Sequence, residues 1–270
     1  MDLIVTTAQQ TIPCISRQAE EIAKRLAVPF IPRKHSSLAA LKEQYGINQL
    51  IVATANGPVV HTPAGEYFFH LSMAELRIKN IVNGNHDHMV TAMNLRTGMS
   101  VLDCTLGLAT DAIVASFVTG ETGRVVGLES SPIITVVADY GLQHFVVDSE
   151  VDITSALRRV KVENADYSER LQAVADNTFD IVYFDPMFRE PIFKSSNVNP
   201  IRSLANMQPL TAEAIRQACR VAKEKVVVKE AAGSSEFARL GITTVVGGKY
   251  SSINYGIIDC QQTLSGGGLP

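Results

Sequence analysis

The chain has 270 residues, of which 46% are hydrophobic and 19% charged, so it can bury a full core and is not an intrinsically disordered protein. It has no apolar run of the roughly 18 residues that a membrane helix needs, and no basic region precedes its apolar N-terminal stretch as in a signal peptide; we expect a cytosolic protein. The net charge of −3 is uneven, with nine basic and seven acidic residues before position 98 and 15 and 20 after it. A protein that bound nucleic acid through phosphates alone would be more basic.

The four cysteines are far apart in the sequence and form no C-x-x-C pair. A structural zinc site needs clustered ligands, and a disulfide scaffold needs more cysteines than this. We therefore predict free thiols, most of them buried, at Cys14, Cys104, Cys219 and Cys260.

The first 72 residues predict a small α/β domain. Ser16 is a candidate N-cap for a helix that ends at Leu26, and Ser36 or Ser37 for a helix that ends near Gly46. We predict strands at 3–7 and 49–54, and a hairpin formed by 59–61 and 66–70.

Two helices are predicted next, at 73–82 and 87–94, and from Ser100 onward strands alternate with helices. The strands are expected at 101–104, 124–128, 160–163, 180–184 and 225–229, and the helices at 133–145 and 152–158, with one more after the first strand. Alternation of this kind is typical of a parallel sheet with right-handed crossovers. The stretches 243–246 and 253–259 predict an antiparallel hairpin that brings the sheet to seven strands. We assign 73–264 to this second domain and expect 265–270 to be a flexible tail.

The loop after the first of these strands carries acids. Asp103 ends the strand, Gly107 lets a ligand approach the backbone, and Thr110 and Asp111 stand where the next helix begins. A phosphate-binding loop usually has more glycine, and two carboxylates would repel a phosphate. The loop therefore suits a cationic ligand such as an ammonium or a sulfonium, while an ordinary strand–helix turn is the alternative.

Acids also follow the next two strands. Glu129 can accept both hydroxyls of a ribose, because one carboxylate offers two oxygens. Asp166 can accept from an adenine amino group, although Asp is common after strands as a helix cap. Ligands bind at the carboxyl ends of the strands in open α/β sheets, so these acids are expected at one edge.

The strongest signal is the stretch Asp185-Pro186-Met187-Phe188 after the strand at 180–184. Proline fixes the backbone, so the Asp185 carboxylate and the Pro186 carbonyl can point at a ligand. The Phe188 ring can stack on a planar base. The lone pair of an exocyclic amine is spread into its ring, and acceptors on its N–H groups can restore a nucleophilic geometry. The alternative is a strand-ending turn with Phe188 in the core.

These motifs, in this order, resemble a class I S-adenosylmethionine-dependent methyltransferase with a Rossmann-like sheet, and more closely the ribosomal small-subunit RNA methyltransferase J family, which methylates the N2 amine of a guanine. The resemblance spans roughly residues 73 to 229 and includes Asp139-Tyr140-Gly141-Leu142 and the strand that ends at Lys229. It implies S-adenosylmethionine as cofactor and ribosomal RNA as substrate. It implies cofactor contacts at Thr110, Asp111, Glu129, Ser130, Ala165, Asp166 and Asp185.

The chain departs from the family at two places. Ala109 stands where the family loop usually has a second glycine. The basic run that follows the phenylalanine in the family is here Arg189-Glu190-Pro191-Ile192-Phe193-Lys194.

Other features admit several interpretations. His86-Asp87-His88 has the residue types of a metal site, but histidines at i and i+2 of a helix point apart, so a solvated helix start or a wall of the substrate cleft is favoured and no metal is expected. Lys229 can bind a substrate phosphate or pair with an acid. Arg33, Lys34, Arg77 and Lys79 can form an RNA-facing patch or an ordinary wet surface.

Three functions are consistent with the sequence. The first is methyl transfer to a nucleobase amine, with Asp185, Pro186 and Phe188 at the reacting group. The second is a nicotinamide-dependent oxidoreductase, which the lack of G-x-G-x-x-G between Asp103 and Ala112 disfavours. The third is a non-catalytic RNA-binding module with the same fold.

Overall fold

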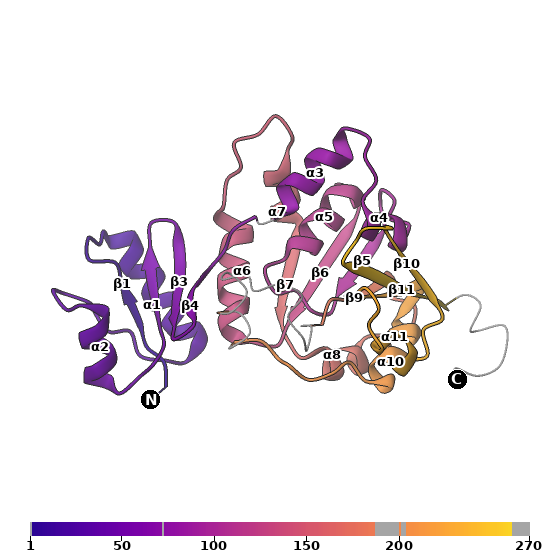
Figure 1. The fold of residues 1–270 in the computed structure, drawn as a ribbon. Coiled ribbons are helices and arrows are strands. Elements are labelled where there is room, and N and C mark those ends of the chain that lie inside the picture. The colour runs from indigo at the N-terminus through magenta and orange to yellow at the C-terminus, as the bar shows by residue number, and fades with distance from the viewer. Residues whose placement is uncertain (1, 72, 187–199, 201–203, 261–270) are drawn as a thin grey trace. The chain divides into compact units, whose positions relative to one another are not determined.

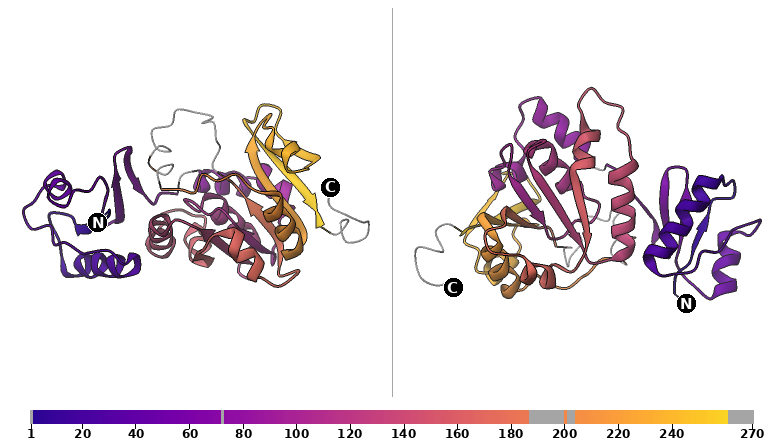
Figure 2. Two further views of the ribbon diagram at one scale, coloured as in Figure 1. Left: turned by 90° about the horizontal axis from the view of Figure 1, so that it is seen from below. Right: turned by 180° about the vertical axis from the view of Figure 1, so that it is seen from behind.

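The computed structural model describes residues 2–71, 73–186, 200 and 204–260, and the contacts divide the chain into two compact units (Figures 1 and 2). The first unit consists of the described residues within Met1–His70, Ser131–Phe145 and Lys194–Ala205. The second unit consists of those within Leu71–Ser130, Val146–Phe193 and Asn206–Pro270. The predicted tail at 265–270 lies outside the described residues.

The first unit contains a four-stranded sheet in the order β1-β2-β3-β4. β1 pairs with β2 in parallel, and the other pairs are antiparallel, so the predicted strands and hairpin are confirmed. A small core of Ile4, Leu41, Ile47, Leu50 and Val52 lies against the sheet. The elements are β1 (Val5–Thr7), α1 (Pro13–Leu26), α2 (Leu38–Tyr45), β2 (Leu50–Thr54), β3 (Gly57–Thr62) and β4 (Gly65–Phe68).

One of the two predicted helix caps is confirmed. The Ser37 side chain accepts a hydrogen bond from the backbone N–H of Ala40 at the start of α2. The predicted Ser16 cap is wrong, because α1 begins at Pro13 after Ile12. Proline is favoured in the first helical turn, where its missing N–H costs nothing and its φ already suits a helix.

Helix α6 (Pro132–His144) belongs to the first unit by its contacts. Gly141 faces the Phe69 ring so closely that an added Cβ would lie 1.9 Å from the ring's Cγ. The glycine in the predicted helix at 133–145 is thus explained by close packing inside a helix and not by a turn.

The second unit is built on a seven-stranded sheet in the order β10-β11-β9-β8-β5-β6-β7 (Figure 1). The five strands from β9 to β7 in this order are parallel, and β11 and β10 complete the sheet as an antiparallel hairpin. The predicted α/β fold with a mostly parallel sheet and a C-terminal hairpin is confirmed. The strands are β5 (Ser100–Asp103), β6 (Arg124–Glu129), β7 (Val160–Asn164), β8 (Phe179–Phe184), β9 (Ala222–Ala231), β10 (Thr244–Gly247) and β11 (Ile253–Asp259).

Helices of the second unit cover both faces of this sheet. On one face lie α3 (Ala74–Val82), α4 (His88–Met93), α5 (Thr110–Thr119) and α7 (Ile153–Arg159). The other face carries α8 (Tyr167–Ala173), α10 (Ala212–Val221) and α11 (Glu236–Arg239). None of these three was predicted, although α10 buries a regular apolar face. Within the described part of the chain, no helix is long and apolar enough to cross a membrane.

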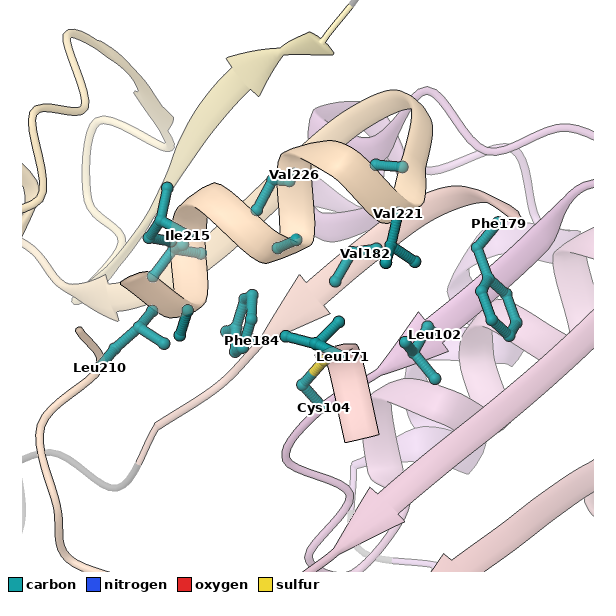
Figure 3. Packing of buried hydrophobic residues seen from close by; sticks show 14 of the residues in the cluster. Leu102, Cys104, Leu171, Phe179, Val182, Phe184, Leu210, Ile215, Val221 and Val226 are labelled. Carbon is teal, nitrogen blue, oxygen red and sulfur yellow. The ribbon is translucent and has the colours of Figure 1, made fainter. Parts of the chain in front are cut away.

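The core between the sheet and α10 contains every second side chain of the central strands, and the side chains between them point to the other face (Figure 3). Leu102, Val182 and Val226 all point into this core. Side chains alternate along a strand, so Tyr183 and Lys229 face the opposite layer, which contains α3 and α5. The side chains of Tyr183 and Lys229 are therefore directed to the same face of the sheet.

Candidate functional site

The predicted acids lie at the carboxyl ends of neighbouring strands. β8, β5, β6 and β7 are adjacent in the sheet. Asp103 ends β5 and Glu129 ends β6, while Asp185 and Asp166 follow β8 and β7. Four positions that are up to 82 residues apart in sequence therefore meet at one edge of the second unit.

The loop after β5 is held by its neighbours on both sides. The Thr105 hydroxyl accepts a hydrogen bond from the backbone N–H of Asp185 at 2.6 Å. The backbone N–H of Gly107 donates to Glu129 Oε2 at 3.1 Å. Gly107 has a φ of 52° and Ala109 a φ of 61°, so the loop needs the left-handed region twice. Ala109 thus keeps a conformation that favours glycine.

Glu129 and Asn164 join the ends of β6 and β7. Glu129 is only 8% exposed. Its backbone carbonyl accepts from the Asn164 side chain at 2.8 Å and from the backbone N–H of Ala165 at 3.0 Å. Ser130 follows at the same edge, where its carbonyl accepts from Asn164. These contacts give the second half of the edge a fixed backbone with a carboxylate beside it.

Asp166 has the helix-cap geometry that the sequence left open. Its Oδ1 accepts from the backbone N–H of Ser168 at 2.8 Å and from the Ser168 hydroxyl at 2.6 Å, at the start of α8. Oδ2 accepts from the Asn206 side chain at 3.4 Å. The cap fixes the carboxylate beside Ala165 at the end of β7.

Asp111 is the centre of a buried ion-pair network. Its carboxylate accepts hydrogen bonds from Arg77 on α3, from the Tyr183 hydroxyl at 2.8 Å and from Lys229 at 2.9 Å. Arg77 also binds Asp87, the N-cap residue of α4, through two nitrogens. Burial alone would raise the pKa of Asp111, but Lys229 and Arg77 outweigh it and hold the pKa well below its ordinary value.

Lys229 connects this network to Asp185. The sheet register pairs Phe184 with Val228, so Asp185 and Lys229 are lateral neighbours at the ends of β8 and β9. Lys229 Nζ lies 2.7 Å from Asp185 Oδ2. Burial would lower the pKa of Lys229, but Asp111 and Asp185 raise it far above its ordinary value. Of the two roles left open for Lys229, the structure shows pairing with acids.

Asp103 and Asp185 are less well compensated than Asp111. Asp103 is 2% exposed and accepts from the backbone N–H of Thr105. The pKa of Asp103 is raised to about 8, chiefly by burial and also by the charges of Asp111 and Asp185, while the backbone hydrogen bond from Thr105 and the charge of Lys229 oppose the rise. Burial also raises the pKa of Asp185, and Lys229 offsets this only in part.

Among the described residues, the charges of this network do not balance. Arg77 and Lys229 are its two cations. Four acidic side chains face them: Asp87, Asp103, Asp111 and Asp185. Asp103 is mostly protonated below about pH 8, and the other three carboxylates still outnumber the two cations. A buried cluster with more carboxylates than cations favours a positively charged ligand, as the sequence predicts for the loop after β5.

Other predicted residues lie outside the described part of the chain or have contacts that differ from the prediction. Phe188 is outside the described residues, so its role stays a prediction. Neither interpretation left open for Arg77, an RNA-facing patch or a wet surface, is correct, because its side chain is 18% exposed and bound to two carboxylates. Lys79 pairs with Glu75 on the surface of α3, whereas Arg33 is in the first unit.

The sequence did not predict that Arg77, Tyr183 and Thr105 belong to the site. A signal exists for Arg77, because helical periodicity places it on the same side of α3 as the buried Ala74 and Ile78. Tyr183 is a polar side chain within a buried strand, and a buried polar group needs a hydrogen-bond partner. Nothing in the sequence singles out Thr105. Over the described ranges, no three His, Cys, Asp or Glu side chains are grouped as a metal site.

Comparison with known proteins assigns the chain to a family. The model of the SAM_MT family, described as "Putative SAM-dependent methyltransferase", matches residues 63–251. A Bacillus subtilis (strain 168) protein, "Uncharacterized protein YpiP", is 34% identical over 255 residues, or 94% of this chain and 98% of that protein.

More distant similarities agree with this match. The "Ribosomal RNA small subunit methyltransferase J" of Aliivibrio fischeri (strain ATCC 700601 / ES114) is 29% identical over 158 residues, which cover 54% of this chain and 60% of that protein. The crystal structure of the SAM-dependent methyltransferase NGO1261 from Neisseria gonorrhoeae superimposes with a TM-score of 0.66 at 15% identity and covers 96% of each chain. At that identity the likeness shows the fold alone.

Proposed function

Because this chain belongs to the SAM_MT family of S-adenosylmethionine-dependent methyltransferases, we propose that it methylates an exocyclic amine of a nucleobase in RNA. The specific candidate is the N2 amine of a guanine in small-subunit ribosomal RNA. The relation to the RNA methyltransferase J proteins supports this substrate. The observation that carries the proposal is Asp185: its carboxylate lies at the carboxyl edge, bound to Lys229, with a proline as the next residue.

The residues at the edge fit S-adenosylmethionine. The excess of carboxylates around Lys229 suits the cationic part of this cofactor, and Asp103 is the acid available to it. Glu129 suits the ribose hydroxyls, since it lies beside the Gly107 backbone and accepts hydrogen bonds. Thr110, Ser130, Ala165 and Asp166 border the same edge and complete the proposed cofactor site.

When bound, the cofactor supplies a methyl group made electrophilic by the positive sulfur. Asp185 and the Pro186 carbonyl hold the substrate amine by accepting its N–H hydrogens. The hydrogen bond from the Asp185 backbone N–H to Thr105 and the contact with Lys229 fix the position of this acceptor. Correct alignment of two reactants can account for several kcal/mol of the barrier.

Asp185 also suits the proton that the amine must lose. Its pKa is raised by burial, so a carboxylate oxygen of Asp185 is a better proton acceptor than an exposed aspartate. A base within a duplex must be flipped out to reach this acceptor, whereas loop RNA needs less rearrangement.

Labelled methyl transfer tests the proposal. We expect the protein to transfer labelled methyl groups from S-adenosylmethionine to RNA from a strain that lacks the gene, with the product identified by nucleoside mass spectrometry. Asp185→Ala should lower the rate by about 10²–10⁴-fold. Transfer that is unchanged in Asp185→Ala would contradict the assigned role.

A calorimetric comparison separates this function from the oxidoreductase alternative. S-adenosylhomocysteine should bind, and NADH should not. Cofactor binding with no methyl transfer to RNA would leave the family assignment intact and refute the substrate.

A further inference from the structure

Two segments of the second unit, a hairpin loop and the start of a helix, lie against each other beside the proposed site. The first is the hairpin loop, residues 248–252, between β10 and β11; the second is the start of α4 at His88. A Cβ added at Gly248 would lie 2.7 Å from His88 Nε2. Helix α4 also packs on β11 (Figure 1). The absence of a side chain at Gly248 thus allows this close approach.

The hairpin loop is at the same edge of the sheet as the proposed cofactor site. β11 runs antiparallel to β9, and the backbone N–H of Ala232 donates to the carbonyl of Ser252 at 2.9 Å. Ala232 is three residues beyond Lys229, a distance of about 10 Å along a strand. Nucleotides that flank a target base at Asp185 can span this distance.

The start of α4 is connected to the site through Arg77. Asp87 caps α4 by accepting from the backbone N–H of Val90, and it binds Arg77, which also binds Asp111. The hairpin loop is therefore fixed relative to the site through β9, and the start of α4 is fixed through Arg77.

The hairpin loop presents an aromatic ring and a cation to solvent. Tyr250 is 90% exposed, and Lys249 Nζ lies 5.4 Å from the centroid of its ring. Proteins that bind single-stranded nucleic acid combine such groups, because bases stack on aromatic rings and cations meet phosphates. The rest of the loop is Gly248, Ser251 and Ser252, which are small and leave the Tyr250 ring exposed.

The charge around the ring also suits an anionic polymer. Residues 247–252 contain no acid. Asp87 is the single acid among residues 83–88, and it faces Arg77. This surface is neutral to positive, although the chain from residue 98 onward is acidic.

We propose that the hairpin loop, together with His88, binds a single-stranded RNA segment next to the target base. Tyr250 stacks on a base of this segment, and Lys249 contacts a phosphate. The proposal rests on the proposed function, because it assigns the substrate surface of the same site.

Fluorescence anisotropy with a labelled, unstructured 12-nucleotide RNA tests the surface. We expect Tyr250→Ala to weaken binding about tenfold and Tyr250→Phe, which keeps the ring, to stay within twofold of the original protein. Lys249→Ala should weaken binding and reduce its salt dependence. Lys161→Ala is the matched control and should have no effect. Lys161 is exposed on β7, the outermost strand on the side of the sheet away from β10 and β11.

Two further measurements separate this proposal from the proposed function. Calorimetry with S-adenosylhomocysteine should give the same affinity for all four variants. In methyl transfer, Tyr250→Ala should raise KM for RNA and leave kcat within twofold.

The outcomes are distinct. Failure of the original protein to bind the RNA, or equal RNA binding by the original protein, Tyr250→Ala and Lys249→Ala, would overturn the surface. Methyl transfer to RNA with an unchanged KM in Tyr250→Ala would refute the surface and support the function. RNA binding that depends on Tyr250, without any methyl transfer, would support the surface and refute the function.

Discussion

The acidic side chains at the carboxyl ends of the strands are held in two different ways. Beyond β6 and β7, the donors that the structure describes for Glu129 and Asp166 are neutral: backbone N–H groups, a hydroxyl and an amide. Around Lys229 near the end of β9, Asp185 is held by Lys229, and Asp111 at the start of α5 is held by both Lys229 and Arg77. The first arrangement is suited to hydrogen-bond recognition, and the second to charge.

This difference separates two kinds of dependence on single residues. A carboxylate held by neutral donors can lose its charge with little cost to the fold. A buried carboxylate that loses its cation is left uncompensated, which is strongly destabilising. Substitutions in the network around Lys229 should therefore affect stability, and those beyond β6 and β7 should affect cofactor affinity.

The largest effect is expected for Lys229→Met. It leaves two carboxylates without their shared cation and should lower the free energy of unfolding by about 3–5 kcal/mol, as measured by urea denaturation. Lys223→Met is the matched control, because Lys223 pairs with Asp180 while 46% exposed; it should cost less than about 1 kcal/mol. Equal losses in the two variants would contradict the comparison.

Asp103 should give stability a specific pH dependence. Its pKa is raised to about 8 in the folded protein, so the unfolded chain binds fewer protons there and stability falls as pH rises from about 4 to about 8. Between pH 6 and 7.5, this group should account for a loss of about 2 kcal/mol. Asp103→Asn should remove that part of the slope, and chemical denaturation of both proteins at the two pH values would show it. Parallel slopes would refute a protonated Asp103.

Glu129→Gln should affect the cofactor more than the fold. The substitution keeps the shape but loses acceptor strength, and we expect S-adenosylhomocysteine to bind about tenfold more weakly, or about 1.4 kcal/mol, by calorimetry. The free energy of unfolding should change by less than about 1 kcal/mol. Glu163→Gln on β7, which removes the charge that pairs with Arg170, should leave cofactor affinity unchanged.

The smallest effect is expected at Ala109, where the left-handed backbone favours glycine. Ala109→Gly should raise the free energy of unfolding by about 0.5–1 kcal/mol. Ala112→Gly, a matched change within α5, should lower it by about 1 kcal/mol. Thermal unfolding of both variants distinguishes them, and a loss in both would show that the loop does not strain Ala109.

The sequence predicts the strand ends well, and its failures have physical causes. Asp103, Glu129 and Asp185 are each preceded by an apolar strand, and a parallel sheet brings such positions to one edge. Arg77 is mispredicted because an exposed arginine and a buried one look alike until the acids that bind it are located. Those acids are Asp87 and Asp111, and neither is adjacent to Arg77 in the chain.

The helices on the α10 side show a different limit. α10 carries a clear apolar face, whereas α8 has a single fully buried side chain, Leu171. A helix as short as α8 or α11 has too little periodicity to be identified from its pattern. Its existence is determined by tertiary packing, which local sequence does not encode.

The Asp111 cluster also has a consequence for biosynthesis. Arg77, Asp111 and Lys229 come from segments that leave the ribosome at very different times, and Lys229 is synthesised last. A nascent chain that ends before residue 229 contains an acid without one of its two counterions. The ion-pair network therefore cannot be complete until β9 has been synthesised and paired with β8.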